Sequence, residues 1–315
     1  MKHGQQGYSK TDKGGQRKKG GKRGKVGPWP RLQKFWDIRA ACNFIGGGTG
    51  AGLLLVAGFY ALQGLDNTPL VIAGFLSISF GLFMVFLEIG RPWRSINLFF
   101  HPQTSWMTRE GIVAIPLYVS MALSVFFAGQ FIGVLASISA ALLAGLFLYC
   151  QMRILHAARG IPAWRHVAIK PYMLITGMTE GLALALCISV TSAHTALVPI
   201  LALLLFMRLG FWLRYAHQLR IDGAPEASCN KVDDLFIWTM VGNLLPVVLL
   251  VADWWLEVEA IVVLAGLIAA FSGWYTKAIV VTKAAQTRGF RLPRTPVRGQ
   301  GQSRVVGQSG FRQNQ

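Results

Sequence analysis

The sequence predicts an all-α integral membrane protein with eight transmembrane helices and basic, disordered tails. The chain has 315 residues, of which 53% are hydrophobic and 14% charged, a composition typical of a polytopic membrane protein. Its apolar residues fall into eight runs of about 20, each long enough to cross the hydrocarbon layer as a helix. The net charge of +18 lies mostly at the ends, because residues 1–34 carry +10 and residues 283–315 carry +7.

The eight runs define a membrane domain over residues 36–284, flanked by tails at 1–35 and 285–315. The tails are rich in Gly, Gln and basic residues, so they cannot bury a core. We expect them to lie near anionic lipid rather than to bind nucleic acid. The shortest connector is the Gly129–Phe131 turn between the third and fourth runs. The expected spans are 38–62, 69–88, 110–130, 132–152, 172–193, 197–217, 234–252 and 258–280.

The distribution of Lys and Arg among the connectors predicts the orientation. Connectors 63–68, 129–131, 194–196 and 253–259 contain neither residue, whereas the other connectors and both tails contain several. Because basic loops stay inside, we expect both termini and the 88–110 loop in the cytoplasm and the chain in the inner membrane. The first apolar run follows about 37 polar and basic residues and is too long for a signal peptide. Trp254 and Trp255 are expected at the outer interface, and Trp274 and Tyr275 at the inner one.

The first span carries two overlapping GxxxG spacings, Gly46/Gly50 and Gly48/Gly52. Such spacings allow another helix backbone to approach closely. The alternative interpretation is that the glycines leave room for a flat ring. Asn43, one turn earlier, is a polar group that would serve either role.

Two ionisable residues inside spans, Glu180 and Arg208, are functional candidates because charge is costly within the bilayer. Both are expected at similar depth on consecutive helices, which predicts a buried ion pair between them. The alternative role is a step in a proton path.

The sequence predicts no haem, metal or iron–sulfur cluster within this chain. The four cysteines are scattered without a CxxC spacing, which excludes the usual cluster and zinc patterns. No two histidines are expected deep on facing helices, as a transmembrane haem would need.

The 88–110 loop, EIGRPWRSINLFFHPQTSWMTRE, gathers charged, aromatic and proton-exchanging groups at the membrane edge. Loops of this composition often carry function. The alternative is a topogenic basic loop with an aromatic belt. The candidates for proton exchange are Glu88, His101 and Glu110. The candidates for ligand binding are Asn43, Arg91, Trp93, Arg94, Asn97 and Arg109.

This loop resembles the membrane anchor subunits of the dimethyl sulfoxide reductase family of molybdopterin iron–sulfur oxidoreductases. The resemblance rests on an (E/H)-x-G-x-P-W-R-x-x-N run and a following R-E pair; outside the loop it extends only to topology and hydrophobicity. The runs FWDIRAACNFIGGGTGAG and SWMTRE look most like anchors of phenylacetyl-CoA:acceptor oxidoreductases, and a cytoplasmic sulfite dehydrogenase is the other candidate within the family. The matching positions are Glu88, Gly90, Pro92, Trp93, Arg94, Asn97, Ser105, Arg109 and Glu110.

The resemblance implies an exchangeable quinone or quinol, a four-cluster iron–sulfur subunit and a molybdopterin catalytic subunit as partners. It assigns Glu110 to the acidic quinone-site position and Glu88 to a position often occupied by histidine, which is a departure. A second departure is the inward orientation, since some relatives face an exported catalytic subunit. Two alternatives remain: a secondary transporter, although no matching halves are visible in the sequence, and a purely structural anchor without a quinone site.

Overall fold

A computed structural model of the protein describes residues 29–89, 92–189 and 194–289. In this part of the chain eight helices are long and apolar enough to cross a membrane, so the protein is an all-α, multi-pass membrane protein as predicted. The long helices are α1 (Ile38–Leu62), α2 (Thr68–Glu88), α3 (Trp106–Phe126), α4 (Phe131–Ala157), α6 (Ile169–Ile188), α7 (His194–Ile221), α9 (Phe236–Leu256) and α10 (Glu259–Thr282). The short ones are the 3₁₀ helix η1 (Pro92–Phe99), α5 (Pro162–Arg165) and α8 (Glu226–Asp233).

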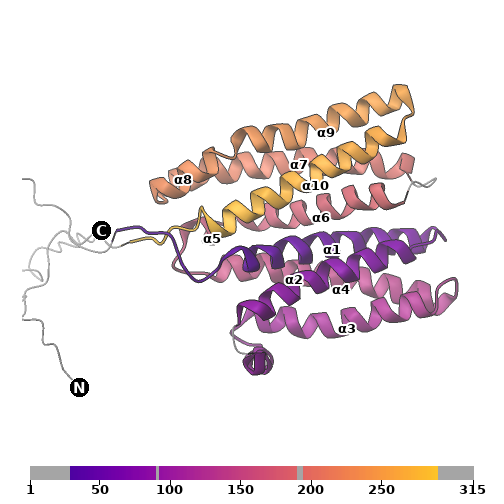
Figure 1. The fold of residues 1–315 in the computed structure, drawn as a ribbon, viewed down its shortest axis with the longest axis horizontal. Coiled ribbons are helices and arrows are strands. Elements are labelled where there is room, and N and C mark those ends of the chain that lie inside the picture. The colour runs from indigo at the N-terminus through magenta and orange to yellow at the C-terminus, as the bar shows by residue number, and fades with distance from the viewer. Residues whose placement is uncertain (1–28, 90–91, 190–193, 290–315) are drawn as a thin grey trace, which may run out of the picture. The chain divides into compact units, whose positions relative to one another are not determined.

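The long helices form two groups of four, each packed as a closed ring (Figure 1). Helices α1 to α4 contact one another in chain order, and α4 returns to α1. The second ring is formed in the same way by α6, α7, α9 and α10, with α10 returning to α6. Helix α1 joins the two rings by contacting α6 and α10. Both rings begin at the same end of the bundle (Figure 1), so the halves correspond in helix order and run in the same direction. This correspondence is not visible in the sequence.

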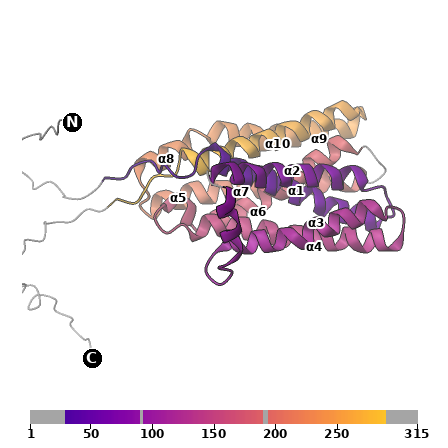
Figure 2. The same cartoon turned by 60° about the horizontal axis from the view of Figure 1, so that its bottom comes forward.

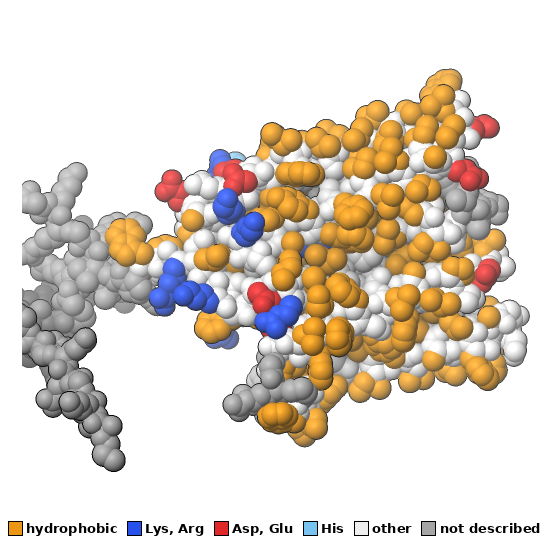
Figure 3. Space-filling view, in the orientation of Figure 1, with side chains coloured by type: hydrophobic (Ala, Val, Ile, Leu, Met, Phe, Trp, Pro, Cys, Tyr) orange, Lys and Arg blue, Asp and Glu red, His pale blue; other side chains and the backbone are white. Residues whose placement is uncertain are grey.

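We call the end that carries residues 30 and 288 the proximal end, and the opposite end the distal end. The proximal end also carries η1, α5 and α8, as both ribbon views show (Figure 2). The α1–α2, α3–α4 and α9–α10 connectors lie at the distal end (Figure 1). Basic side chains gather at the proximal end, whereas hydrophobic side chains cover the length of the helices (Figure 3). This apolar surface is the one that contacts the bilayer.

Helix α3 begins earlier than the sequence predicts, and this changes the position of Glu110. The Ser105 hydroxyl accepts the Thr108 amide at 3.2 Å, which caps the helix so that it begins at Trp106. Glu110 therefore lies within the helix, one turn from its start, rather than at its first residue. Helices α4 and α7 also extend beyond the predicted ends, to Ala157 and Ile221.

Helix α1 is packed on two glycine faces, which confirms the packing interpretation of its glycines. A Cβ on Gly46 would lie 2.5 Å from the Ser77 carbonyl oxygen of α2. On the other face, a Cβ on Gly52 would lie 2.3 Å from the Gly177 carbonyl oxygen of α6. Backbones this close leave no space for a ring at these positions.

Gly52→Val should prevent the normal approach of α1 and α6. Overpacking in a close-packed interior costs about 1–3 kcal/mol, and here the obstacle is backbone, which cannot rotate away. We expect a lower melting temperature of the purified chain in detergent. Gly145→Val on α4 is the matched control, because nothing lies within 4 Å of a Cβ built there. Equal effects of the two substitutions would show that the α1–α6 contact is not a tight one.

Parts of both predicted tails pair with each other at the proximal end. Leu32 and Gln286 form an antiparallel bridge, flanked by a bond from the Gln33 amide to the Ala285 carbonyl at 3.0 Å. The Arg288 amide also donates to the Gly160 carbonyl at 3.1 Å. Residues 31–33 and 285–288 therefore belong to the packed domain, whereas the predicted disorder of the tails concerns residues that mostly lie outside the described ones.

The orientation across the membrane stays a prediction, and reporter fusions test it. Fusions at Asn67 and Glu257, in distal connectors, should report the outside of the cell. Fusions at Gln103 and Ala224, in proximal connectors, should report the cytoplasm. The reversed pattern would contradict the expected topology and would place any soluble partner on the other side.

Candidate functional site

A buried carboxyl group lies between two amides in the first ring of helices. Glu110 of α3 is only 4% exposed, and its Oε1 accepts from the Asn43 Nδ2 of α1 at 3.4 Å. Gln151 of α4 donates from Nε2 to the Asn43 backbone carbonyl at 3.0 Å, and its amide also interacts with the Glu110 carboxyl group. We call Asn43, Glu110 and Gln151 the Glu110 cluster; all three lie within two turns of the proximal helix ends.

The Glu110 cluster has unused hydrogen-bonding capacity. The Asn43 Oδ1 is buried and has no partner in the described part of the chain. Gln151 lies directly against the α1 backbone, because a Cβ on Gly47 would be 2.1 Å from its Nε2. A buried polar atom without a partner is rare and often marks a place where a ligand or water binds. Sequence reasoning found Asn43 and Glu110 but missed Gln151, whose signal is a carboxamide inside an otherwise apolar span.

The Arg109 guanidinium binds backbone carbonyls of the loop before α3, not a carboxylate side chain. Its Nε donates to the Pro102 carbonyl at 2.7 Å and its Nη2 to the Gln103 carbonyl at 2.9 Å. The guanidinium also lies 4.0 Å from the ring centre of Trp106, and Arg153 approaches the same ring at 4.6 Å. These contacts fix the loop that precedes α3, so Arg109 positions the segment carrying Glu110.

Glu88 belongs to a different part of the proximal end. It is the last residue of α2 and is half-buried, and the charges that act on it are those of Asp37 and Arg39. Asp37 caps α1 by accepting the Arg39 amide at 2.7 Å, and its carboxylate pairs with the Arg39 guanidinium at 2.8 Å. This pairing lowers the pKa of Asp37. In the described part of the chain, Glu88 and Glu110 are not joined by a hydrogen bond or an ion pair.

The remaining predicted site residues are not brought to the Glu110 cluster by any described contact. Trp93, Asn97 and His101 are exposed. Arg94 lies in η1, but its side chain is outside the described residues, as is the whole of Arg91. The predicted set thus divides into the Glu110 cluster, the Glu88 region and the exposed loop.

A second polar group lies deep in the bundle, where the two rings meet. Glu180 of α6 pairs with Lys277 of α10, with Oε2 and Nζ 2.6 Å apart and both side chains at most 1% exposed. The Thr49 hydroxyl of α1 donates to the same Oε2 at 2.9 Å. Trp274 donates from Nε1 to the Thr49 hydroxyl at 2.9 Å, so its indole nitrogen is bound to this group; its place at the inner membrane interface stays a prediction.

The predicted direct pair between Glu180 and Arg208 is wrong. Arg208 binds neutral acceptors, including the Asn243 Oδ1 at 2.7 Å and the Ala269 carbonyl at 2.8 Å. The two charges still approach each other at Gly273, where a Cβ would lie 2.5 Å from the Glu180 Oε1 and 3.1 Å from the Arg208 Nη1. The error arose because consecutive helices were taken as partners, whereas the ring also places α10 beside α6.

The two polar groups meet on successive carbonyls of α1. The Asn43 carbonyl accepts from Gln151, and the Phe44 carbonyl accepts from the Lys277 Nζ at 3.1 Å. A Cβ on Gly48 would lie 2.5 Å from that Nζ, so the glycine run of α1 accommodates polar side chains as well as backbones. Lys277 lies inside a predicted transmembrane span, and this position could have identified it from the sequence as a buried charge.

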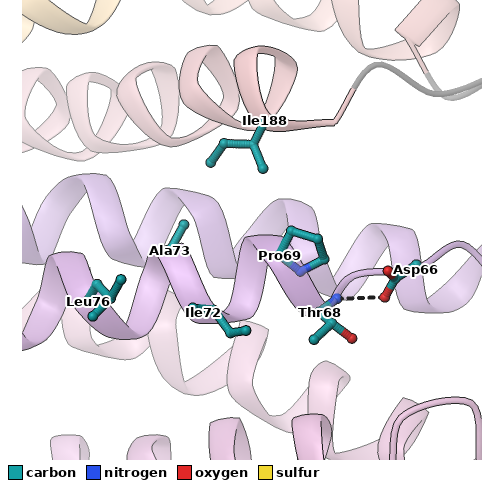
Figure 4. Close-up of a pocket in the computed structure, with 7 residues that line it drawn as sticks. All are labelled: Asp66, Thr68, Pro69, Ile72, Ala73, Leu76 and Ile188. Atoms are coloured by element: carbon teal, nitrogen blue, oxygen red, sulfur yellow. Dashed lines mark hydrogen bonds between the residues drawn. The ribbon is translucent and has the colours of Figure 1, made fainter.

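Two cavities lie at the distal end, away from the Glu110 cluster. One, of about 410 Å³, is partly polar and is lined by Asn67, Ser124 and Ser137 among others. The other, of about 480 Å³, is a shallow apolar groove beside α2 (Figure 4). Ile188 of α6 points toward Pro69 and Ala73 of α2 (Figure 4), and Asp66 lies at the end of the groove, accepting the Thr68 amide at 3.0 Å.

Comparison with known proteins adds no relative to this description. No protein-family model matches the chain, and no curated protein matches it. The resemblance of the 88–110 loop therefore rests on the residues of the loop itself.

Proposed function

We propose that this chain is the membrane anchor subunit of a molybdopterin iron–sulfur oxidoreductase and that it binds quinone or quinol at the Glu110 cluster. The observation that carries the proposal is a buried carboxyl group between two carboxamides, at the start of the helix whose loop resembles a quinone-site loop. Amides and a carboxyl group are the donors and proton-exchanging groups that quinone oxygens require.

The chemistry assigned to the Glu110 cluster is proton exchange. Reduction of a quinone takes two electrons and two protons, and Glu110 is the only carboxyl group of the cluster. Asn43 and Gln151 orient a quinone oxygen by hydrogen bonding, and Arg109 keeps the preceding loop fixed. Glu88 and His101, which are more exposed than Glu110, return protons from solution in this proposal.

Electrons enter from outside the bilayer in this proposal. The iron–sulfur subunit docks at the proximal end, which is expected to face the cytoplasm, and connects to the molybdopterin subunit. The Glu110 cluster lies near that end, about one to two turns from the helix termini, which keeps the electron-transfer distance short. Because electrons and protons then come from the same side, turnover is expected to be electroneutral.

Isolation of the intact complex tests this function. A tagged chain is purified from its native membrane, its partners are identified by mass spectrometry, and quinone-dependent turnover is measured. A molybdopterin subunit and a ferredoxin-like subunit in the purified complex are the expected result. A chain that purifies without either subunit from gently solubilised membranes would contradict the proposal.

The buried charges favour a second candidate function, a secondary transporter. Intramembrane ionisable groups often mark ion paths. Glu180 and Lys277 lie where the two rings meet, and Arg208 lies within the second ring. The test is proton flux into liposomes that contain the purified chain alone, driven by a potassium diffusion potential. Flux that disappears in Glu180→Gln would favour the transporter; its absence in the wild type would favour the anchor.

A further inference from the structure

The 3₁₀ helix η1 carries an exposed apolar face. A 3₁₀ helix has three residues per turn, so Trp93, Ile96 and Phe99 lie along one side of it. These side chains are 69%, 61% and 44% exposed, and the adjoining Phe100 is 63% exposed. Large apolar groups at this spacing form a strip that is largely exposed, although the edge of the Phe99 ring lies against the start of α3.

Contacts with α3 fix the direction in which this strip faces. A Cβ on Gly111 of α3 would lie 3.3 Å from both the Leu98 Cδ2 and the Phe99 Cε1, so the end of η1 is docked on the start of α3. In the two ribbon views η1 lies beside the bundle and crosses the direction of the long helices (Figures 1 and 2). Its axis therefore runs along the membrane plane, and Trp93 and Ile96 are left facing outward.

The strip lies next to the surface that contacts lipid. Phe83 and Phe86 near the end of α2, and Ile112 and Ile115 near the start of α3, are all exposed. Helix η1 connects these two helices at their proximal ends. An apolar face at this level and in this direction meets the boundary between headgroups and acyl chains, where tryptophan is favoured.

We infer that η1 is an in-plane interfacial helix whose exposed Trp93 and Ile96 side chains insert into the lipid leaflet at the proximal end. The segment contains no acidic residue, and Arg91 and Arg94 flank Trp93 in the sequence, a composition that complements anionic headgroups. The inference does not depend on the proposed function. It assigns this part of the 88–110 loop to the membrane, so a soluble partner has to dock elsewhere on the proximal end.

Lipid quenching of Trp93 fluorescence tests the inference. The full chain and its Trp93→Phe variant are reconstituted in liposomes, and the difference between their emission spectra isolates Trp93. Lipids brominated near the headgroup should quench this difference strongly, and lipids brominated near the chain ends should quench it weakly. Trp212→Phe is the control, because Trp212 is buried and its difference spectrum should respond to neither lipid.

Two results would overturn the inference. Emission of Trp93 that is unaffected by both brominated lipids, and that is quenched by acrylamide in water, would leave the strip free for a soluble protein. Stronger quenching by the deep bromines than by the shallow ones would place η1 inside the hydrocarbon layer. Because Trp93 is exposed, its conservative replacement by Phe should leave the fold intact, and size-exclusion chromatography verifies this.

Discussion

Glu110→Gln is expected to lower quinone-linked turnover of the purified complex by about 10²–10⁴-fold, the usual contribution of a positioned acid or base. Glutamine keeps the size of the side chain and can still bond the Asn43 amide through its oxygen, but it cannot exchange a proton. Turnover with a soluble artificial acceptor should stay at the wild-type level, because such an acceptor takes electrons before they reach the membrane. The measurement is the ratio of the two activities on one preparation.

A matched control separates proton exchange from a general effect of losing a carboxylate. Glu259 lies exposed at the start of α10 on the distal end, and Glu259→Gln should leave both activities unchanged. A parallel fall of both activities in Glu110→Gln would assign Glu110 to assembly of the complex. Unchanged quinone-linked turnover would place the quinone elsewhere and would favour the structural-anchor alternative.

The number and approximate positions of the transmembrane helices could be predicted from the sequence, because the length of each hydrophobic run decides them. Each span needs about 20 apolar residues, and the eight predicted spans correspond to eight helices. Helix ends were less predictable, since local capping sets them. Ser105 moved the start of α3 by one turn, and nothing in the hydropathy of the segment marks that position. The close approach of other helix backbones to α1 was predicted from its glycines, whereas the identity of those helices, α2 and α6, was not.

The polar interior was less predictable, because it depends on which helices are neighbours. Asn43 and Glu110 were identified one at a time from the chemistry of their side chains, but their contact depends on how α1 and α3 pack. Lys277 was overlooked as a buried charge, and Glu180 was therefore given the wrong partner. The exposed loop residues were grouped with Glu110 by sequence proximity, whereas Glu110 lies on the buried face of α3 and His101 is exposed in the loop before it.

Lys277→Met is expected to destabilise the folded chain more than any other single charge removal in the interior. It leaves the Glu180 carboxylate at the centre of the bundle with only the Thr49 hydroxyl as a direct donor. Removing one partner of a buried pair costs about 3–5 kcal/mol. The Arg208 guanidinium beside Gly273 offsets part of that cost, so we expect the lower end of the range. The melting temperature of the purified chain in detergent measures the effect.

The double variant Glu180→Gln with Lys277→Met should recover most of the lost stability, because it removes both charges together and leaves Arg208 on its neutral acceptors. Lys283→Met, at the exposed end of α10, should melt at the wild-type temperature and controls for loss of a lysine. A single variant as stable as the wild type would mean that Glu180 is protonated in the folded chain and needs no counter-ion. A double variant as unstable as the single one would mean that Lys277 stabilises α1 through its bond to the Phe44 carbonyl and that the ion pair contributes little.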